Sequence, residues 1–145
     1  SIKFKILMVG SYNSEKDRIL INEVINKNNL QKVVEIKNEV PNSEIYKIYN
    51  EIDLLFNVSF SEGFPNVILE SLKYKCPVLT SYNTGVSDFF SNDFPIFYTT
   101  ISKKDITKKV FNIYEELNKK KYTYNLEKNS VEYIRQLFNN YYKDL

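Results

Sequence analysis

Short apolar runs alternate along the chain with longer segments in which apolar residues recur every three or four positions. The short runs predict strands over residues 4–9, 32–36, 53–58, 77–80 and 95–98. The longer segments predict helices over residues 17–28, 66–74, 102–120 and 127–143, and a shorter helix whose apolar residues are Ile45, Ile48, Tyr49 and Ile52. Ser14 is predicted as the N-cap of the first helix. Strands separated by helices favour an α/β fold, a Rossmann-like parallel sheet of about five strands with helices on both faces.

The pattern predicts one domain over residues 1–145, because no Gly/Ser linker, low-complexity tract or internal repeat interrupts it. In open parallel sheets, ligands bind beyond the carboxyl ends of the strands. This rule directs attention to the loops at residues 10–13, 37–42, 59–65 and 81–88.

Composition excludes several classes of protein. The net charge of +2, from 20 basic and 18 acidic residues, gives no argument for a nucleic-acid partner. The chain has no histidine, which removes serine–histidine triads, histidine bases and histidine-ligated zinc. The single cysteine, Cys76, cannot form an intramolecular disulfide, so we expect a buried apolar role and a reducing, cytoplasmic setting.

No apolar run approaches the roughly 20 residues that span a bilayer. We interpret the lysine-dense stretch at residues 103–121 as the solvated face of a helix. The alternative is contact with lipid headgroups, which would place the protein peripherally at the inner face of a membrane.

The segment at residues 61–71 carries the candidate chemistry. It follows the apolar run at residues 53–58 and enters a predicted helix through a turn at Gly63 and Pro65. Pro65 suits a helix start because it has no N–H to leave unpaired there. The first amides of the helix, at residues 66–68, form the kind of N-terminus that attracts phosphate.

Two carboxylates flank this predicted anion site. Glu62 precedes the helix, and Glu70 lies about one turn inside it. A carboxylate that accepts from two vicinal hydroxyl groups is a good ribose ligand. The order Glu70, amides, Glu62 therefore matches the order ribose, diphosphate, sugar in a nucleotide-sugar.

The context Ser-Glu-Gly-Phe-Pro-Asn at Glu62 and Leu-Glu-Ser-Leu at Glu70 resembles the E-x7-E motif of retaining glycosyltransferases of family GT4, which have the GT-B fold. Spacing alone is weak, because Glu15 and Glu23 have the same separation, but the intervening turn gives the motif weight. The resemblance extends over residues 33–56, 76–88 and the final helix. It implies the C-terminal, donor-binding half of a longer two-domain enzyme, without its first strand and the basic diphosphate clamp after that strand.

The resemblance also implies roles for individual residues. Glu70 would hold the ribose, while Glu62 would contact the donor sugar and serve as the catalytic residue. Further contacts to the donor sugar and diphosphate would come from Gly63, Phe64, Pro65, Asn66, Val67 and Gly85. Further contacts to the nucleotide would come from Gly10, Asn38, Val40 and Asn42.

The implied activity is metal-independent, retaining transfer of a hexose from a UDP- or GDP-sugar, with no cofactor. The chain contains no Asp-x-Asp, the metal-binding device of the other major glycosyltransferase fold. The acceptor, a glycan or a lipid-linked sugar such as a capsule or lipopolysaccharide precursor, would be held by an N-terminal domain. We therefore expect this chain alone to be inactive.

Two residues depart from the family pattern. Lys75 stands where members usually have a glycine, and Thr84 stands at the first of two positions that are often both glycine. We expect Thr84 to alter the sugar pocket.

Two alternatives remain. The first is a non-catalytic nucleotide-binding or regulatory module. The phospho-receiver type needs an acidic pair where Gly10 and Ser11 stand, and the dehydrogenase type needs a glycine-rich turn that a chain with three glycines lacks. The second is a GT-B relative such as a sugar-nucleotide epimerase, which usually relies on histidines.

Overall fold

The computed structural model describes residues 4–63, 65–88, 90 and 94–119. The chain divides into two compact units, residues 1–45 and residues 46–145, and each is described here by itself. The single-domain organisation stays a prediction.

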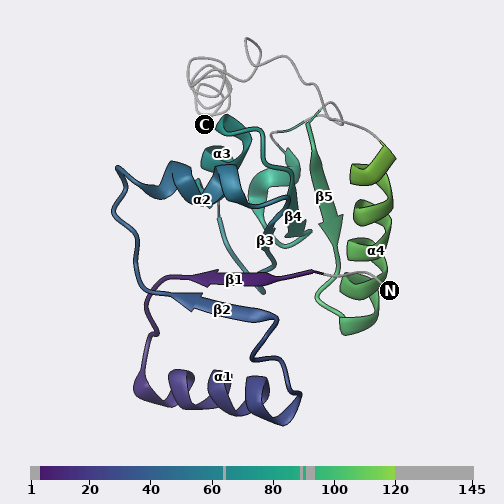
Figure 1. Cartoon of the computed structure of the whole chain (residues 1–145). Helices are drawn as coiled ribbons and strands as arrows, with labels where there is room; N and C mark the ends of the chain where they lie inside the picture. Colours follow the sequence, from purple (N-terminus) through teal and green to yellow (C-terminus); the bar gives the residue numbers. More distant parts are fainter. Residues whose placement is uncertain (1–3, 64, 89, 91–93, 120–145) are drawn as a thin grey trace. The chain divides into compact units, whose positions relative to one another are not determined.

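The first unit contains β1 (Ile6–Val9), α1 (Glu15–Lys27) and β2 (Val34–Lys37). β1 and β2 pair in parallel, so that Ile6 lies opposite Val34 (Figure 1). The chain leaves β1 at Gly10, whose φ of 133° is a conformation that residues with a side chain rarely adopt.

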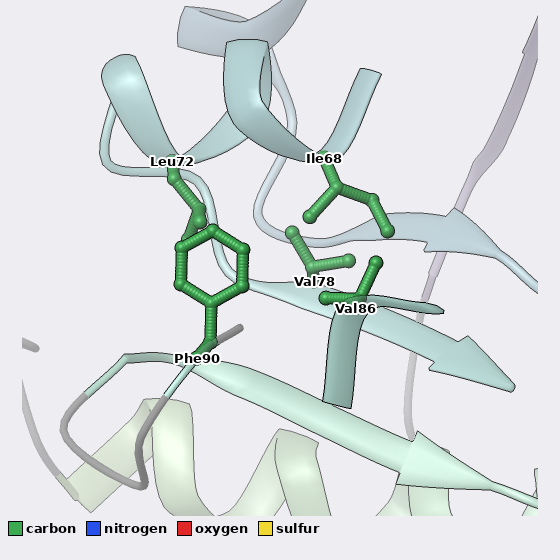
Figure 2. Close-up of a cluster of buried hydrophobic side chains, with 5 residues drawn as sticks. All are labelled: Ile68, Leu72, Val78, Val86 and Phe90. Carbon is green, nitrogen blue, oxygen red and sulfur yellow. The ribbon is translucent and has the colours of Figure 1, made fainter. Parts of the chain in front are cut away.

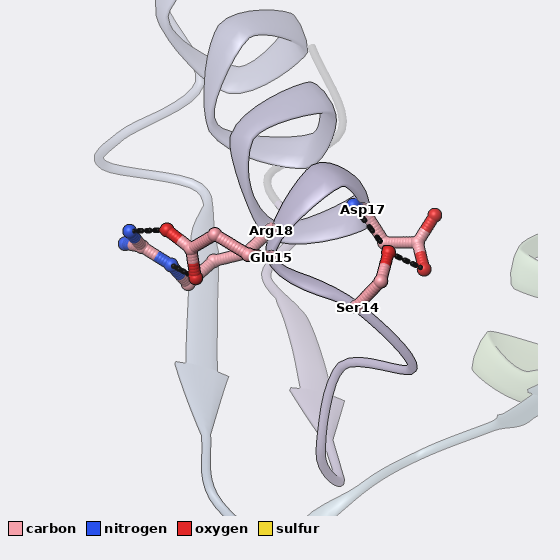
Figure 3. Close-up of polar contacts among 4 residues, drawn as sticks. All are labelled: Ser14, Glu15, Asp17 and Arg18. Atoms are coloured by element: carbon pink, nitrogen blue, oxygen red, sulfur yellow. Dashed lines mark hydrogen bonds and ion pairs between the residues drawn. The ribbon is translucent and has the colours of Figure 1, made fainter.

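Helix α1 begins where the sequence predicts a cap. The Ser14 hydroxyl accepts a hydrogen bond from the Asp17 amide at 3.1 Å and donates one to the Asp17 carboxylate at 2.8 Å (Figure 3). This cap satisfies one of the amides that have no partner within the helix. Beside it, Arg18 forms an ion pair with Glu15, which lowers the pKa of the Glu15 carboxyl.

The second unit begins within α2 (Ile45–Glu51) and continues with β3 (Leu55–Asn57), α3 (Asn66–Lys73) and β4 (Val78–Ser81). A 3₁₀ turn η1 (Gly85–Asp88), β5 (Ile96–Thr99) and α4 (Lys103–Lys119) complete its described part. The strands form a parallel sheet in the order β3-β4-β5. Helices α3 and α4 cover opposite faces of this sheet (Figures 1 and 2).

Strand β4 is the centre of this unit, and all four of its residues are buried. On the α3 side, the core is a cluster of five buried apolar side chains: Ile68, Leu72, Val78, Val86 and Phe90 (Figure 2). Each such side chain contributes about 1.5–3 kcal/mol when it leaves water. This packing holds α3 against β4.

Lys75 shows why this position usually carries glycine. Its φ is 61°, in the left-handed region, directly after the C-cap of α3 at Tyr74. The Lys75 amide donates to the Leu72 carbonyl at 3.0 Å, and the Cys76 amide donates to the Ser71 carbonyl at 2.9 Å. These two bonds define a Schellman motif, in which glycine is preferred because it has no Cβ.

The α/β class with parallel strands and intervening helices is confirmed, and the described strands form a two-stranded and a three-stranded sheet. Cys76 is buried, as expected, and burial raises the pKa of its thiol. The predicted helix at residues 127–143 lies outside the described residues. None of the described helices has the length and apolar character needed to cross a bilayer.

Candidate functional site

Two loops of the second unit lie side by side beyond the carboxyl ends of β3 and β4. Residues 58–65 are named the donor loop after the contacts that the sequence predicts for them, and residues 82–85, which end at the first residue of η1, are the facing loop. Glu62 and Thr84 form an isolated parallel bridge between them. Next to it, the Gly85 amide donates to the Gly63 carbonyl at 2.8 Å. The side-chain amide of Asn83 donates to the Phe60 carbonyl at 2.9 Å, so three successive contacts join the loops.

A buried hydroxyl anchors the start of the donor loop to the end of β4. Ser81 is fully buried, and its hydroxyl donates to the Ser59 carbonyl at 2.6 Å. The same oxygen accepts from the Ser59 amide at 3.2 Å. The amide and the carbonyl of Ser59 therefore both have hydrogen-bond partners, although Ser59 belongs to no strand.

Gly85 is required by the close approach of the two loops. A Cβ built on this residue would lie 2.9 Å from the Gly63 carbonyl oxygen, whereas a Cβ on Gly63 would meet no atom within 4 Å. The structure thus brings together two of the glycines that the sequence indicates for donor binding. Their contact with a ligand stays a prediction.

The Thr84 side chain is buried and hydrogen-bonded inside the second unit. Its side chain is 2% exposed, and its hydroxyl donates to the Ser81 carbonyl at 2.9 Å. The Thr80 hydroxyl lies 3.3 Å from it. This burial turns the Thr84 side chain away from solvent, and its expected effect on a sugar pocket stays a prediction.

Glu62 is half-buried and is oriented by a neighbour on β3. The side-chain amide of Asn57 donates to Oε2 of Glu62 at 3.3 Å. Sequence reasoning missed Asn57, although a single polar residue at the end of an apolar strand was a signal that could have found it.

Helix α3 begins at Asn66 with Pro65 as its N-cap, one residue earlier than the helical position that suits proline. The Pro65 carbonyl accepts from the Ile68 amide at 3.1 Å, and Pro65 itself makes no side-chain cap. Asn66 and Val67 are exposed, so the first amides of α3 can meet an anion. Phe64 lies outside the described residues.

Glu70 lies on α3 and is half-buried. Its Oε2 accepts a hydrogen bond from the Tyr49 hydroxyl at 2.9 Å. Tyr49 is 5% exposed, and burial, followed by the hydrogen bond to Glu70, raises the pKa of its hydroxyl. Sequence reasoning placed Tyr49 on the apolar face of a helix and assigned it no role in the site.

The remaining predicted nucleotide contacts lie in the first unit. Gly10 closes β1, Asn38 and Asn42 are exposed after β2, and Val40 is half-buried between them.

A hydrogen bond joins the two loops at the carboxyl ends of β1 and β2. The Ser11 hydroxyl donates to the Glu39 carboxylate at 2.7 Å. Beside Ser11, between these strands and α1, is a cavity of about 360 Å³ whose lining includes Gly10, Tyr12 and Asp17. In this unit too, the loops that the sequence indicates lie at the carboxyl end of the sheet.

Metal-binding side chains do not gather in the part of the chain that the structure describes. No group there has three or more His, Cys, Asp or Glu side chains placed to hold an ion.

The family model described as "Glycosyl transferases group 1" matches residues 1–136 of the chain. No curated protein matches it. Among solved structures, HepE from Anabaena in complex with UDP-glucose is similar, with a TM-score of 0.69 and 19% identity over 79% of this chain and 32% of HepE. The HepE structure in complex with UDP gives the same TM-score at 18% identity, over 78% of this chain and 32% of HepE.

Sucrose-phosphate synthase from Thermosynechococcus elongatus is similar as well, with a TM-score of 0.68 and 16% identity over 97% of this chain and 39% of that protein. At these identities the likeness shows the fold. The chain spans about a third of the length of the solved structures that it matches.

Proposed function

Because this chain belongs to the glycosyl transferases group 1 family, we propose that it is the donor-binding half of a two-domain, retaining glycosyltransferase of the GT4 type. The proposed enzyme binds a UDP- or GDP-sugar without a metal ion and transfers the hexose to a glycan or a lipid-linked acceptor. A further domain holds the acceptor.

One observation carries this proposal. Glu62 precedes the open start of α3 along the chain and Glu70 lies within this helix, both in a single unit and close in sequence to the contact between Gly63 and Gly85. Along the chain, a helix N-terminus whose N-cap residue, Pro65, makes no side-chain cap therefore comes between two carboxylates. An elongated ligand with an anionic centre and hydroxyl groups at both ends fits that order of groups.

The same arrangement supports a mechanism. Departure of the nucleoside diphosphate develops negative charge on its β-phosphate, and preorganised amides at a helix start stabilise such charge. Glu62, oriented by Asn57, holds the donor sugar, and Glu70 holds the ribose. We assign neither carboxylate the role of nucleophile.

UDP is the first nucleotide to test, because the similar HepE structures contain UDP and UDP-glucose. We would titrate this chain with UDP and GDP by calorimetry, in buffer containing a chelator. We expect one nucleotide to bind. Glu70→Ala should lower its affinity by at least tenfold, since a charge-assisted hydrogen bond contributes roughly 1.5–3 kcal/mol. Glu23→Ala, an exposed carboxylate on α1, is the matched control and should leave affinity unchanged.

If neither nucleotide binds this chain, the same titration of the full-length enzyme decides the matter. Binding there that depends on Glu70 supports the donor site, whereas a full-length enzyme that binds neither nucleotide overturns it. The stereochemistry has its own test. NMR of the first product formed by the full-length enzyme should show the anomeric configuration of the donor, and inversion would refute the retaining mechanism.

A further inference from the structure

The geometry points to Tyr49 as a positioning residue, which sets the orientation of the Glu70 carboxylate before a nucleotide arrives. This inference rests on the proposed function, because it assigns Tyr49 a part in recognising the ribose. Tyr49 lies on α2 and Glu70 on α3, so the contact joins two helices of the second unit.

The Tyr49 hydroxyl has one proton and two acceptors within reach. Oε2 of Glu70 is 2.9 Å away, and the Val67 carbonyl oxygen is 3.4 Å away. An ionised carboxylate is the stronger acceptor, and here it is also the nearer one. The proton is therefore directed at Glu70.

The ring that carries this hydroxyl is held firmly. It is 5% exposed and stacks on Tyr74, with ring centroids 5.7 Å apart and an interplanar angle of 10°. Tyr74 is the C-cap of α3, whereas Val67 belongs to its first turn. The Tyr49 side chain therefore contacts both ends of α3, and its hydroxyl has a fixed position relative to that helix.

A fixed donor restricts a flexible acceptor. A glutamate side chain has several rotatable bonds, and a hydrogen bond to Oε2 selects the rotamers that keep this oxygen at Tyr49. A carboxylate offers about four lone-pair sites, so one bond to Tyr49 leaves capacity for the two ribose hydroxyls. Because Glu70 is ordered beforehand, nucleotide binding does not bear the full cost of ordering it.

The test compares Tyr49→Phe with Tyr46→Phe. Both remove a hydroxyl from α2 and keep the ring, but Tyr46 is 41% exposed, and its ring is tilted by 39° from that of Tyr74 at a centroid distance of 6.4 Å. UDP and 2′,3′-dideoxy-UDP are the ligands, or the GDP pair if GDP binds more tightly. Tyr49→Phe should weaken binding of the ribose nucleotide about two- to tenfold, which corresponds to the entropic cost of ordering one flexible side chain. It should leave binding of the dideoxy nucleotide unchanged.

Tyr49→Phe should also cause no further loss in a Glu70→Gln background, since its effect passes through Glu70. Equal weakening of both nucleotides, or an additive loss in the double variant, overturns the positioning role. Tyr46→Phe should bind both nucleotides as the unaltered chain does.

A second measurement does not need a nucleotide. Side-chain scalar couplings of Glu70, measured by NMR on the ligand-free chain, should indicate one dominant rotamer in the unaltered chain and averaging in Tyr49→Phe. Unchanged couplings in Tyr49→Phe overturn the inference even if UDP binds. Changed couplings without nucleotide binding by the chain or the full-length enzyme support the contact and count against the proposed function instead.

Discussion

Replacing Gly85 with alanine tests whether the two loops of the second unit are held together as the structure shows. The added Cβ would lie 2.9 Å from the Gly63 carbonyl oxygen. That oxygen belongs to the backbone and accepts the Gly85 amide at 2.8 Å, so it cannot rotate away as a side chain would. The donor loop must therefore move.

The size of the effect follows from that distance. Ordinary contact begins at 3.4 Å. The carbonyl must therefore recede by about 0.5 Å, which is overpacking that typically costs about 1–3 kcal/mol. The same movement lengthens a hydrogen bond whose net contribution is about 1 kcal/mol. We expect Gly85→Ala to lower the free energy of unfolding by about 2–3 kcal/mol.

Urea unfolding followed by circular dichroism measures this difference. With a slope near 2 kcal/mol per molar urea, the midpoint should fall by about 1 M. The matched control is Gly63→Ala, whose Cβ meets no atom within 4 Å and which should change stability by less than about 0.5 kcal/mol. Equal midpoints for the two variants would refute the reasoning, as would a larger loss in Gly63→Ala.

Three further predictions follow from single features. Lys75→Gly should raise the free energy of unfolding by about 0.5–1 kcal/mol, because glycine adopts the φ of 61° without a Cβ penalty; an unchanged or lower melting temperature would contradict this. In calorimetry, Asn57→Ala should lower the affinity for UDP-glucose about threefold and the affinity for UDP much less, because Asn57 orients the carboxylate assigned to the sugar. Equal losses for both ligands would disprove that assignment. Cys76 should react with iodoacetamide at pH 8 at least about tenfold more slowly in the folded chain than in urea, because burial raises the pKa of its thiol. Equal rates would show that the thiol is accessible.

Local rules were sufficient for much of the fold. Ser14 was predicted as a helix cap because a hydroxyl before an amphipathic segment can accept from the first turn, and the structure contains that bond. A strand was predicted from the short apolar run at residues 77–80, and the structure has β4 at Val78–Ser81, with all four residues buried. In both cases the deciding contact lies within a few residues or follows from burial alone.

The site depended on contacts that local periodicity does not encode. The hydrogen bond from Tyr49 to Glu70 joins residues 21 apart in sequence, and the Gly85 amide reaches Gly63 across a helix and a strand. The pattern showed Tyr49 as an apolar-face residue, because the position of its hydroxyl depends on how α2 packs against α3. The departure at Lys75 was visible in sequence, but only the backbone conformation gives its physical reason.

The contacts between the donor loop and the facing loop bear on any attempt to change donor preference by exchanging segments between enzymes. The main-chain groups of Ser59, Phe60 and Gly63 in the donor loop are bonded by groups at the end of β4 or just after it. These groups are the Ser81 hydroxyl, the Asn83 side-chain amide and the Gly85 N–H. A grafted donor loop would arrive without these partners unless its host supplied them. The smallest exchangeable cassette is therefore discontinuous, residues 58–65 together with residues 81–85, and a chimaera that moves the first segment alone would lose the shape it was meant to transfer.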